Sequence, residues 1–94
     1  MENLEFEWDS PKAESNAKKH GVTFEDACSV FADEHAKLIH DPDHSVLEDR
    51  FVLLGLASSM KLLVVCHCYR SGGNVIRIIS ARKATAHESR QYGG

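Results

Sequence analysis

Two arginines stand close together in the last third of the chain, Arg77 within the apolar run of residues 75–80 and Arg82 just after it. A run rich in valine and isoleucine predicts a β-strand, so the sequence places fixed positive charge on a rigid element. A guanidinium can donate paired hydrogen bonds to the oxygens of a phosphate group. Arg77 is therefore the first candidate for phosphate contact. Arg82, expected at the junction between this strand and the start of a helix, is the second.

Charge is divided unevenly along the chain. Residues 60–94 carry six Lys and Arg against one acid, a balance of +5, whereas residues 1–59 carry five against thirteen, a balance of −8. The cations of the basic segment are Lys61, Arg70, Arg77, Arg82, Lys83 and Arg90. The net charge of −3 thus conceals a polarised molecule, which favours a phosphate-bearing partner met by one face. The alternative interpretation is that the charges of a small protein are unevenly distributed by chance, without a partner for the basic part.

The composition is that of an ordinary globular chain, with 43% hydrophobic and 27% charged residues. A chain of 94 residues can bury one modest core, so a single domain over residues 1–94 is expected. No apolar run approaches the roughly 20 residues of a membrane span, and the acidic N-terminus lacks the apolar segment of a signal peptide. We therefore expect a cytoplasmic protein without membrane contact.

The cysteines do not predict a disulfide framework or a metal site. Cys28, Cys66 and Cys68 are odd in number, and the last two point the same way on a predicted strand, too close in sequence to brace a fold. Cys66-His67-Cys68 lacks a second paired cluster, and the histidines of residues 35–44 show no zinc spacing. We expect small core residues, with neither metal nor cofactor.

The N-terminal part predicts a strand and a helix. Residues 4–8 alternate apolar and acidic side chains, as in a short strand with one apolar face. Ser10 followed by proline is typical of a helix N-terminus, with Ser10 as the N-cap. Gly21 after three cationic residues is typical of a helix end. A helix is therefore expected over residues 11–20.

A second, amphipathic helix is predicted after Thr23, which with Asp26 resembles a capping box. Its apolar side chains recur at helical spacing and share one face: Phe24, Ala27, Cys28 and Phe31. Residues 36–39 are compatible with an edge strand, and residues 40–45 with a polar turn.

Three runs rich in valine, isoleucine and leucine follow, at residues 51–56, 62–69 and 75–80. The connections between them are short, which predicts antiparallel strands. Residues 82–92 are compatible with a helix that has few apolar anchors. The whole pattern predicts an α+β domain with helices against one face of the sheet.

Strand alternation assigns the side chains of two runs to faces. In the run at 62–69, His67 shares a face with Tyr69. The next run is expected to place Val75, Arg77 and Ile79 on one side, and Ile76, Ile78 and Ser80 on the other. An arginine midway along a central strand is costly to bury alone, so we expect Arg77 to open on the face that the helices leave uncovered.

Short motifs run through nearly the whole chain in a fixed order. They are Phe6-Glu7-Trp8-Asp9, Lys12, Asn16, Lys19-His20-Gly21-Val22, Phe24-Glu25, Asp41-Pro42-Asp43-His44-Ser45, Glu48, Arg50-Phe51 and Arg77-Ile78-Ile79-Ser80-Ala81-Arg82. Together they closely resemble the BrnT toxin family, although residues after Arg82 match its pattern only loosely.

This resemblance implies both a fold and an activity. BrnT proteins are similar in fold to the RelE-type ribonuclease toxins, so the expected α+β domain is RelE-like: an N-terminal strand and two helices, an antiparallel sheet of three to four further strands, and a C-terminal helix. The implied activity is RNA cleavage by a toxin that a small DNA-binding antitoxin, BrnA, holds inactive. The toxin is expected to form a dimer or a heterotetramer with the antitoxin, and this complex would bind operator DNA through the antitoxin and repress its own operon.

Metal-independent RNA cleavage makes definite chemical demands. A group must deprotonate the 2′-hydroxyl, cations must stabilise the phosphorane, and a donor must protonate the 5′-oxygen. The candidate catalytic residues are Arg77, Arg50, Arg82, His67 and Glu48. Alternatives remain open for three of them. Arg77 could pair with Glu48 or with an acid of the N-terminal strand, Arg50 could form a surface ion pair, and His67 could be a half-buried structural residue.

Other cations and one aromatic residue are candidates for RNA contact. Lys12 and Lys19 lie with Asn16 on one stripe of the first helix, which either extends a positive rim for the RNA backbone or is a solvated face. His20 could simply complete the helix end, and Trp8 either stacks on a base or belongs to the core. The candidates for RNA contact are Lys12, Lys19, His20, Arg70, Lys83 and Trp8.

Two other classes of function remain open. The chain could be a module that binds RNA or an acidic protein without cleaving it. It could also serve chiefly to lock an antitoxin into a DNA-binding dimer. RNA binding without cleavage would indicate the first, and DNA binding only in the partner's presence would indicate the second.

Overall fold

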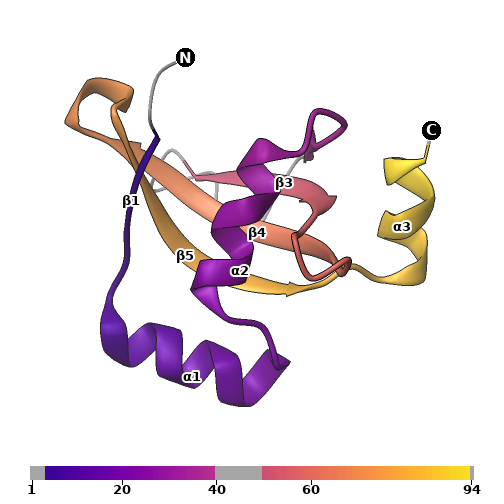
Figure 1. The fold of residues 1–94 in the computed structure, drawn as a ribbon, viewed down its shortest axis with the longest axis horizontal. Coiled ribbons are helices and arrows are strands. Elements are labelled where there is room, and N and C mark those ends of the chain that lie inside the picture. The colour runs from indigo at the N-terminus through magenta and orange to yellow at the C-terminus, as the bar shows by residue number, and fades with distance from the viewer. Residues whose placement is uncertain (1–3, 40–49, 94) are drawn as a thin grey trace.

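The computed structural model describes residues 4–39 and 50–93 of the chain (Figure 1). The elements are β1 (Glu5–Glu7), α1 (Ser10–His20), α2 (Phe24–Ser29), a 3-10 turn (Val30–Ala32), β2 (Lys37–Ile39), β3 (Phe51–Leu56), β4 (Leu62–Arg70), a second 3-10 turn (Ser71–Gly73), β5 (Val75–Lys83) and α3 (Ala86–Tyr92). The predicted α+β class is confirmed. The predicted turn at residues 40–45 and the candidate Glu48 lie outside the described residues.

The strands of the described residues form one sheet in the order β1-β5-β4-β3-β2. The pairs β3–β4 and β4–β5 are antiparallel, as the short connections predict. Strand β2 pairs antiparallel with β3 and lies at an edge, in agreement with the predicted edge strand. At the other edge β1 pairs in parallel with β5, which makes the sheet mixed. This pairing brings the N-terminal strand beside the strand that carries Arg77 (Figure 1).

Side chains and a glycine set the ends of the first two helices. The N-cap of α1 is Asp9 rather than Ser10, because the Asp9 carboxylate accepts the Lys12 backbone N–H at 3.1 Å. Gly21 ends α1 in the left-handed region at φ 68°, and its N–H donates to the Ala17 carbonyl at 2.8 Å. The Thr23 hydroxyl caps α2 by accepting the Asp26 N–H at 3.1 Å, as predicted.

Apolar side chains fill both faces of the sheet. The larger cluster lies beneath α1 and α2 and contains Val22, Phe24, Ala27, Val30, Leu53, Ala57, Leu63, Val65, Ile76, Ile78 and Ala81. A smaller cluster, Val52, Leu54 and Val64, lies on the opposite face and packs against Ile39, Leu62, Ala84 and Tyr92. The last two come from α3 and the segment before it, so the expectation that all helices lie against one face is wrong for α3.

Strand β5 departs from the predicted alternation. Cys66 of β4 pairs with Ser80, but the next residue, His67, pairs with Ile78, so Ile79 is passed over in the register. This bulge moves Ser80 to the face of Arg77, opposite the buried Ile78, and corrects the predicted assignment. Strand β5 also continues to Lys83, so Arg82 lies within the strand rather than at the start of a helix.

Helix α3 is attached through polar contacts as well as through its apolar cluster. The Tyr92 hydroxyl donates to the Asp33 carboxylate at 2.7 Å, and the Leu56 backbone N–H donates to the same oxygen at 2.8 Å. These bonds, with that of Leu56 the larger influence, lower the pKa of Asp33. The Lys37 ammonium donates to the Gln91 carbonyl at 2.8 Å. These contacts hold the last turn of the C-terminal helix, which has few apolar anchors of its own.

The Asn16 side chain completes the edge of β5 where β1 has ended. Its amide nitrogen donates to the Ala81 carbonyl at 2.8 Å and to the Val22 carbonyl at 3.0 Å, and its oxygen accepts the Ala81 N–H at 3.1 Å. The side chain therefore takes both backbone groups of Ala81, as a neighbouring strand would. Asn16 is only 7% exposed. The predicted stripe of Lys12, Asn16 and Lys19 is therefore not a solvated face at its centre.

We expect Asn16→Ala to lower the free energy of unfolding by about 2–4 kcal/mol, because it leaves buried backbone groups without partners. The measurement is denaturant unfolding at neutral pH, with the exposed Asn74→Ala as the matched control. Equal stability of the two variants would show that the Asn16 amide does not hold the α1–β5 junction.

Candidate nucleic-acid interface

Arg77 lies on β5, on the sheet face opposite the larger apolar cluster, and forms an ion pair with Glu7 of β1. The Arg77 Nη1 atom is 2.9 Å from Glu7 Oε2, and Arg70 Nε is 3.5 Å from the same oxygen. The three side chains, which we call the Glu7 cluster, are 31% (Arg77), 56% (Arg70) and 40% (Glu7) exposed. Arg77 therefore pairs with an acid of the N-terminal strand, which was one of the alternatives left open by the sequence. The pairing leaves both guanidinium groups partly exposed to solvent.

The sequence did not single out Glu7 as a site residue. Its place depends on the parallel pairing of β1 with β5, which sets Glu7 beside Arg77 although 70 positions separate them. A three-residue strand carries no pattern that would predict its partner. The sequence pointed to this segment through the motif Phe6-Glu7-Trp8-Asp9 and through the possible pairing of Arg77 with an acid of the N-terminal strand, without naming the acid.

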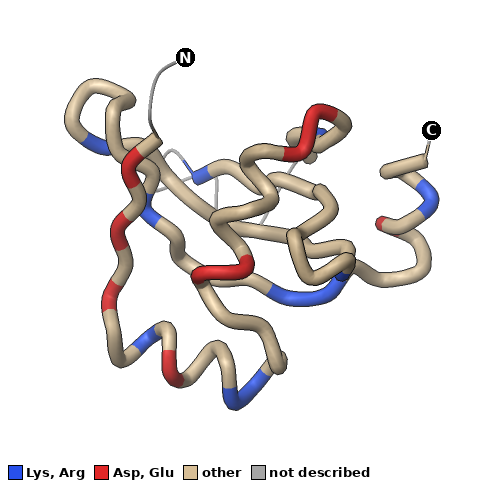
Figure 2. Tube along the Cα trace, viewed as in Figure 1, with Lys and Arg blue, Asp and Glu red and all other residues tan. Residues whose placement is uncertain are grey.

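Cations of β4, of β5 and of the residue before β3 lie at one end of the sheet, the end where Glu7 meets Arg77 (Figure 2). Cys68 of β4 pairs with Arg77, and the residue before Cys68, His67, pairs with Phe51 at the start of β3. Arg50 directly precedes Phe51 and is partly buried. The structure thus brings the backbone of Arg50 to the same end as Arg70 and Arg77, next to the acidic strand β1.

His67 does not belong to this surface. Its side chain is 0% exposed and lies within an aromatic cluster, with ring centroids 4.8 Å from Phe31, 5.3 Å from Tyr69 and 6.0 Å from Phe51. His67 and Tyr69 share a face as predicted, but that face is the one the helices cover. Burial lowers the pKa of His67, partly opposed by the Val65 carbonyl 3.2 Å from Nδ1. This placement favours the structural alternative over proton transfer at Arg77.

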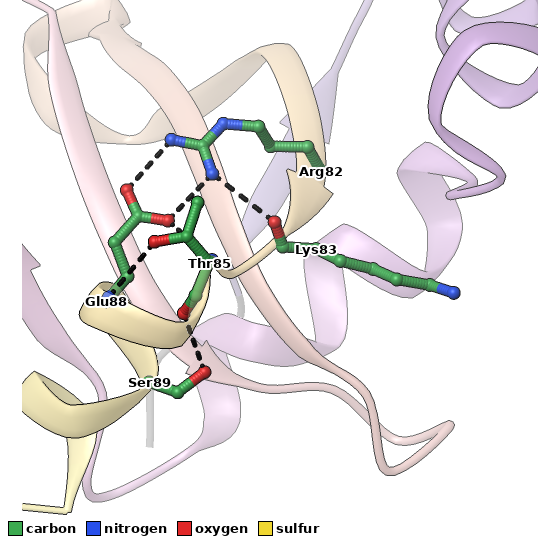
Figure 3. A network of polar contacts seen from close by, with 5 residues as sticks. All are labelled: Arg82, Lys83, Thr85, Glu88 and Ser89. Carbon is green, nitrogen blue, oxygen red and sulfur yellow. Dashed lines mark hydrogen bonds and ion pairs between the residues drawn. The ribbon is translucent and has the colours of Figure 1, made fainter.

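Arg82 is held by the start of α3 (Figure 3). Its Nη1 and Nη2 atoms donate to the two oxygens of Glu88 at 2.8 and 2.9 Å, and Nη1 also approaches the Lys83 carbonyl at 3.3 Å. Glu88 closes a capping box with Thr85, whose N–H donates to Glu88 Oε1 at 2.9 Å. The Arg82 hydrogen bond, above all, lowers the pKa of Glu88 to about 2. The Arg82 side chain, bound to both oxygens of Glu88, therefore links β5 to α3.

The candidates on α1 line a cleft of about 340 Å³ between this helix and β5. Lys12, Lys19 and His20 contribute from the helix, and Ile79 and Ser80 contribute from the bulged part of β5. The structure therefore brings these three RNA-contact candidates to one concave surface.

The remaining candidates are dispersed. Trp8 is half-buried and packs edge-on against Phe24, with centroids 6.0 Å apart, which favours the core alternative. Lys83 is exposed at the end of β5. Among residues 4–39 and 50–93, no group of three or more His, Cys, Asp or Glu side chains is arranged to hold a metal ion. Within the same residues no helix is long and apolar enough to cross a membrane.

A family model described as the ribonuclease toxin BrnT of type II toxin-antitoxin systems matches residues 8–88. The chain belongs to the BrnT family. Its fold is similar to the crystal structure, at 1.1 Å resolution, of the Brucella abortus ribonuclease toxin BrnT. The identity is 25%, the match covers 88% of this chain and 99% of that chain, and the TM-score is 0.66. No curated protein matches the chain.

Membership of the BrnT family fixes the general function. A family of ribonuclease toxins from type II systems implies an activity toward RNA and an antitoxin partner. The resemblance drawn from the motifs is thereby confirmed. The matched residues include Arg70, Arg77 and both sides of the cleft, whereas Glu7 precedes them.

We expect Glu88→Gln to lower the free energy of unfolding by about 1 kcal/mol at pH 7, because a partly exposed ion pair is screened by water. The pKa of Glu88 falls from 4.5 to about 2 on folding, so its contribution is complete above 4.5 and is lost as the pH drops toward 2. Denaturant unfolding across this range, with the exposed Glu14→Gln as control, measures it. A deficit in Glu88→Gln that persists unchanged at pH 2 would contradict the assignment.

We expect His67→Phe to make the thermal midpoint less sensitive to acid. Burial lowers the pKa of His67 in the folded chain, so the unfolded chain binds a proton more readily and stability falls as the pH drops below about 6.5. The measurement compares midpoints at pH 7.5 and 5.5, with the exposed His87→Gln as control. If His67→Phe shows the same acid sensitivity as the parent chain, the imidazole does not stay neutral on folding.

Proposed function

We propose that the chain is an endoribonuclease that cleaves RNA without a metal ion and so inhibits translation in the cytoplasm. A BrnA-like antitoxin neutralises it, and the complex represses its own operon through operator DNA bound by the antitoxin. The observation that carries the catalytic part is the Glu7 cluster, a carboxylate between two partly exposed guanidiniums. The family match supports the toxin and antitoxin roles in general.

The Glu7 cluster has the groups that 2′-hydroxyl attack requires. The Glu7 carboxylate accepts the proton of the 2′-hydroxyl, and the 2′-oxygen then bonds to the adjacent phosphorus. Arg77 and Arg70 donate to the phosphoryl oxygens as negative charge builds on them. The bond from phosphorus to the 5′-oxygen breaks, and the 5′-oxygen takes a proton from a water molecule, whose hydroxide then takes the proton held by Glu7. The products are a 2′,3′-cyclic phosphate and a 5′-hydroxyl end.

The other candidates take supporting parts in this proposal. Arg50 lies at the same end of the sheet and adds positive potential for the RNA backbone. Glu48, just before it in sequence, is a second carboxylate for proton transfer. Arg82 holds α3 through Glu88. His67 supports the sheet from the covered face.

A non-catalytic RNA-binding or antitoxin-binding co-repressor module is the second candidate. One observation favours it: Arg77 and Arg82 are both paired with acids of the chain itself, so their charge is partly neutralised in the isolated protein. In that role the basic surface would grip RNA or the antitoxin, and RNA would stay intact.

We expect purified chain to cleave RNA in excess chelator, and the addition of antitoxin to stop the cleavage. Arg77→Ala and Glu7→Gln should each lower the rate about 100-fold or more, because one removes phosphate charge and the other a general base. Arg90→Ala, an exposed cation of α3, is the matched control and should keep the parent rate. Gel analysis of a labelled RNA, with mapping of the new ends, gives both rate and products.

Two results would contradict the proposal. Intact RNA in every lane, from a folded and antitoxin-free sample, would favour the co-repressor module or a toxin that acts only on translating ribosomes. Cleavage that the chelator abolishes would instead indicate metal-dependent chemistry.

A further inference from the structure

The cleft between α1 and β5 forms because β1 pairs with only the first part of β5. Strand β1 ends at Glu7, and α1 begins at Ser10, so α1 rather than a strand faces the second half of β5. Asn16 ties α1 to Ala81 but leaves the preceding part of β5 uncovered. The bulge at Ile79 faces this gap, and Ile79 and Ser80 form the β5 side of the cleft.

The polar groups that line the cleft suit an anion. Lys12 and Lys19 lie seven positions apart on α1, so they stand on the same side of the helix, with Ser15 between them. His20 and the Ser80 hydroxyl add further possible donors. No carboxylate of the described residues lines the cleft. Two ammonium groups and two hydroxyls around a concave surface match the oxygens of a phosphodiester.

We propose that this cleft binds a backbone phosphate of the RNA strand, beyond the one bound at the Glu7 cluster. The identity of the ligand rests on the function proposed above, whereas the cleft itself does not. Ser80 lies three residues after Arg77 on β5 and on the same face of the sheet, which separates them by about 10 Å along the strand. A single strand of RNA lying along β5 therefore meets Arg77 and then the cleft.

The size of the cleft favours RNA over a segment of the antitoxin. A volume of about 340 Å³ is at the lower end for small-molecule pockets, at roughly 300–1,000 Å³. An α-helix with its side chains is about 10–12 Å across and needs a longer groove. One sugar-phosphate unit is the better match, and its charge is complementary to the lining.

The test is binding of a short single-stranded oligonucleotide with 2′-O-methyl riboses, which lacks the attacking hydroxyl and so reports binding alone. Fluorescence anisotropy across a salt series should show about tenfold weaker binding for Lys12→Ala/Lys19→Ala. The slope of log K against log salt should shrink in magnitude by about 0.7, since the cleft holds one phosphate and each neutralised phosphate of a single strand contributes about 0.7. Both lysines are exposed, and a thermal melt checks that the variant is folded.

Matched variants separate a site from a general charge effect. Lys18→Ala/Lys61→Ala removes the same charge from exposed positions outside the cleft and should weaken binding less than twofold. Ser15→Glu places a carboxylate in the cleft and should weaken binding about as much as the double lysine variant. Ser10→Glu places the same charge on α1 outside the cleft and should have little effect.

The inference is overturned if the two double variants weaken binding alike, if neither does, if the parent chain does not bind the oligonucleotide, or if the cleft variants lose affinity for the antitoxin alone. Binding that depends on the cleft in a chain that cleaves no RNA would support the cleft and refute the ribonuclease proposal. If the parent chain cleaves unmodified RNA but the cleft variants bind the oligonucleotide as well as the parent does, the ribonuclease proposal is supported and the cleft proposal is refuted.

Discussion

The hydrogen bonds between the Asn16 amide and Ala81 fix the relation between α1 and the sheet. Strand β1 supplies only three residues to the edge of β5, and beyond them the backbone groups of Ala81 would lie unpaired beneath the helix. Buried backbone groups without partners are costly, so a side chain that both donates and accepts is required there. Once Asn16 is in place, α1 lies along β5, Lys12 and Lys19 face Ser80, and β1 meets β5 with Glu7 beside Arg77.

The same acids that orient the arginines also restrain them. Glu7 holds Arg77 across the β1–β5 junction, and Glu88 holds Arg82 across the β5–α3 junction. Partly exposed pairs of this kind contribute about 0–1 kcal/mol each, so a phosphodiester can compete for the guanidinium at little cost. Such pairs set the direction of the two arginine side chains in the free protein. Under the function proposed above, they would break when the arginines bind RNA.

Local patterns predicted the elements of this chain better than their tertiary relations. Runs rich in valine, isoleucine and leucine were sufficient to find β3, β4 and β5, and strand alternation placed His67 with Tyr69. Gly21 marked the end of α1 because glycine readily adopts the left-handed conformation that ends a helix. The bulge at Ile79 could not be predicted, because the sequence of an apolar run does not show whether one residue is skipped in the pairing. The bulge nevertheless places Ser80 on the opposite face of the sheet from the one predicted. The pairing of Glu7 with Arg77 joins residues 70 positions apart through a three-residue strand. The burial of Asn16 depends on the packing of α1 against β5, and the burial of His67 depends in part on Phe31 of the first 3-10 turn.

The burial of His67 and the exposure of Glu7 together explain why the proposal assigns the general base to Glu7 rather than to His67. A histidine is the usual choice for a base near neutral pH, but an imidazole enclosed by Phe31, Phe51 and Tyr69 has no path to a substrate on the opposite face. A carboxylate that is 40% exposed and already within reach of two guanidiniums has such a path. Arginine also lowers the charge on the phosphate that the 2′-oxygen must approach, which makes a weaker base sufficient. The face beneath α1 and α2 contains the histidine, and the opposite face contains the Glu7 cluster. This division supports the proposal that carboxylate and guanidinium groups perform the cleavage.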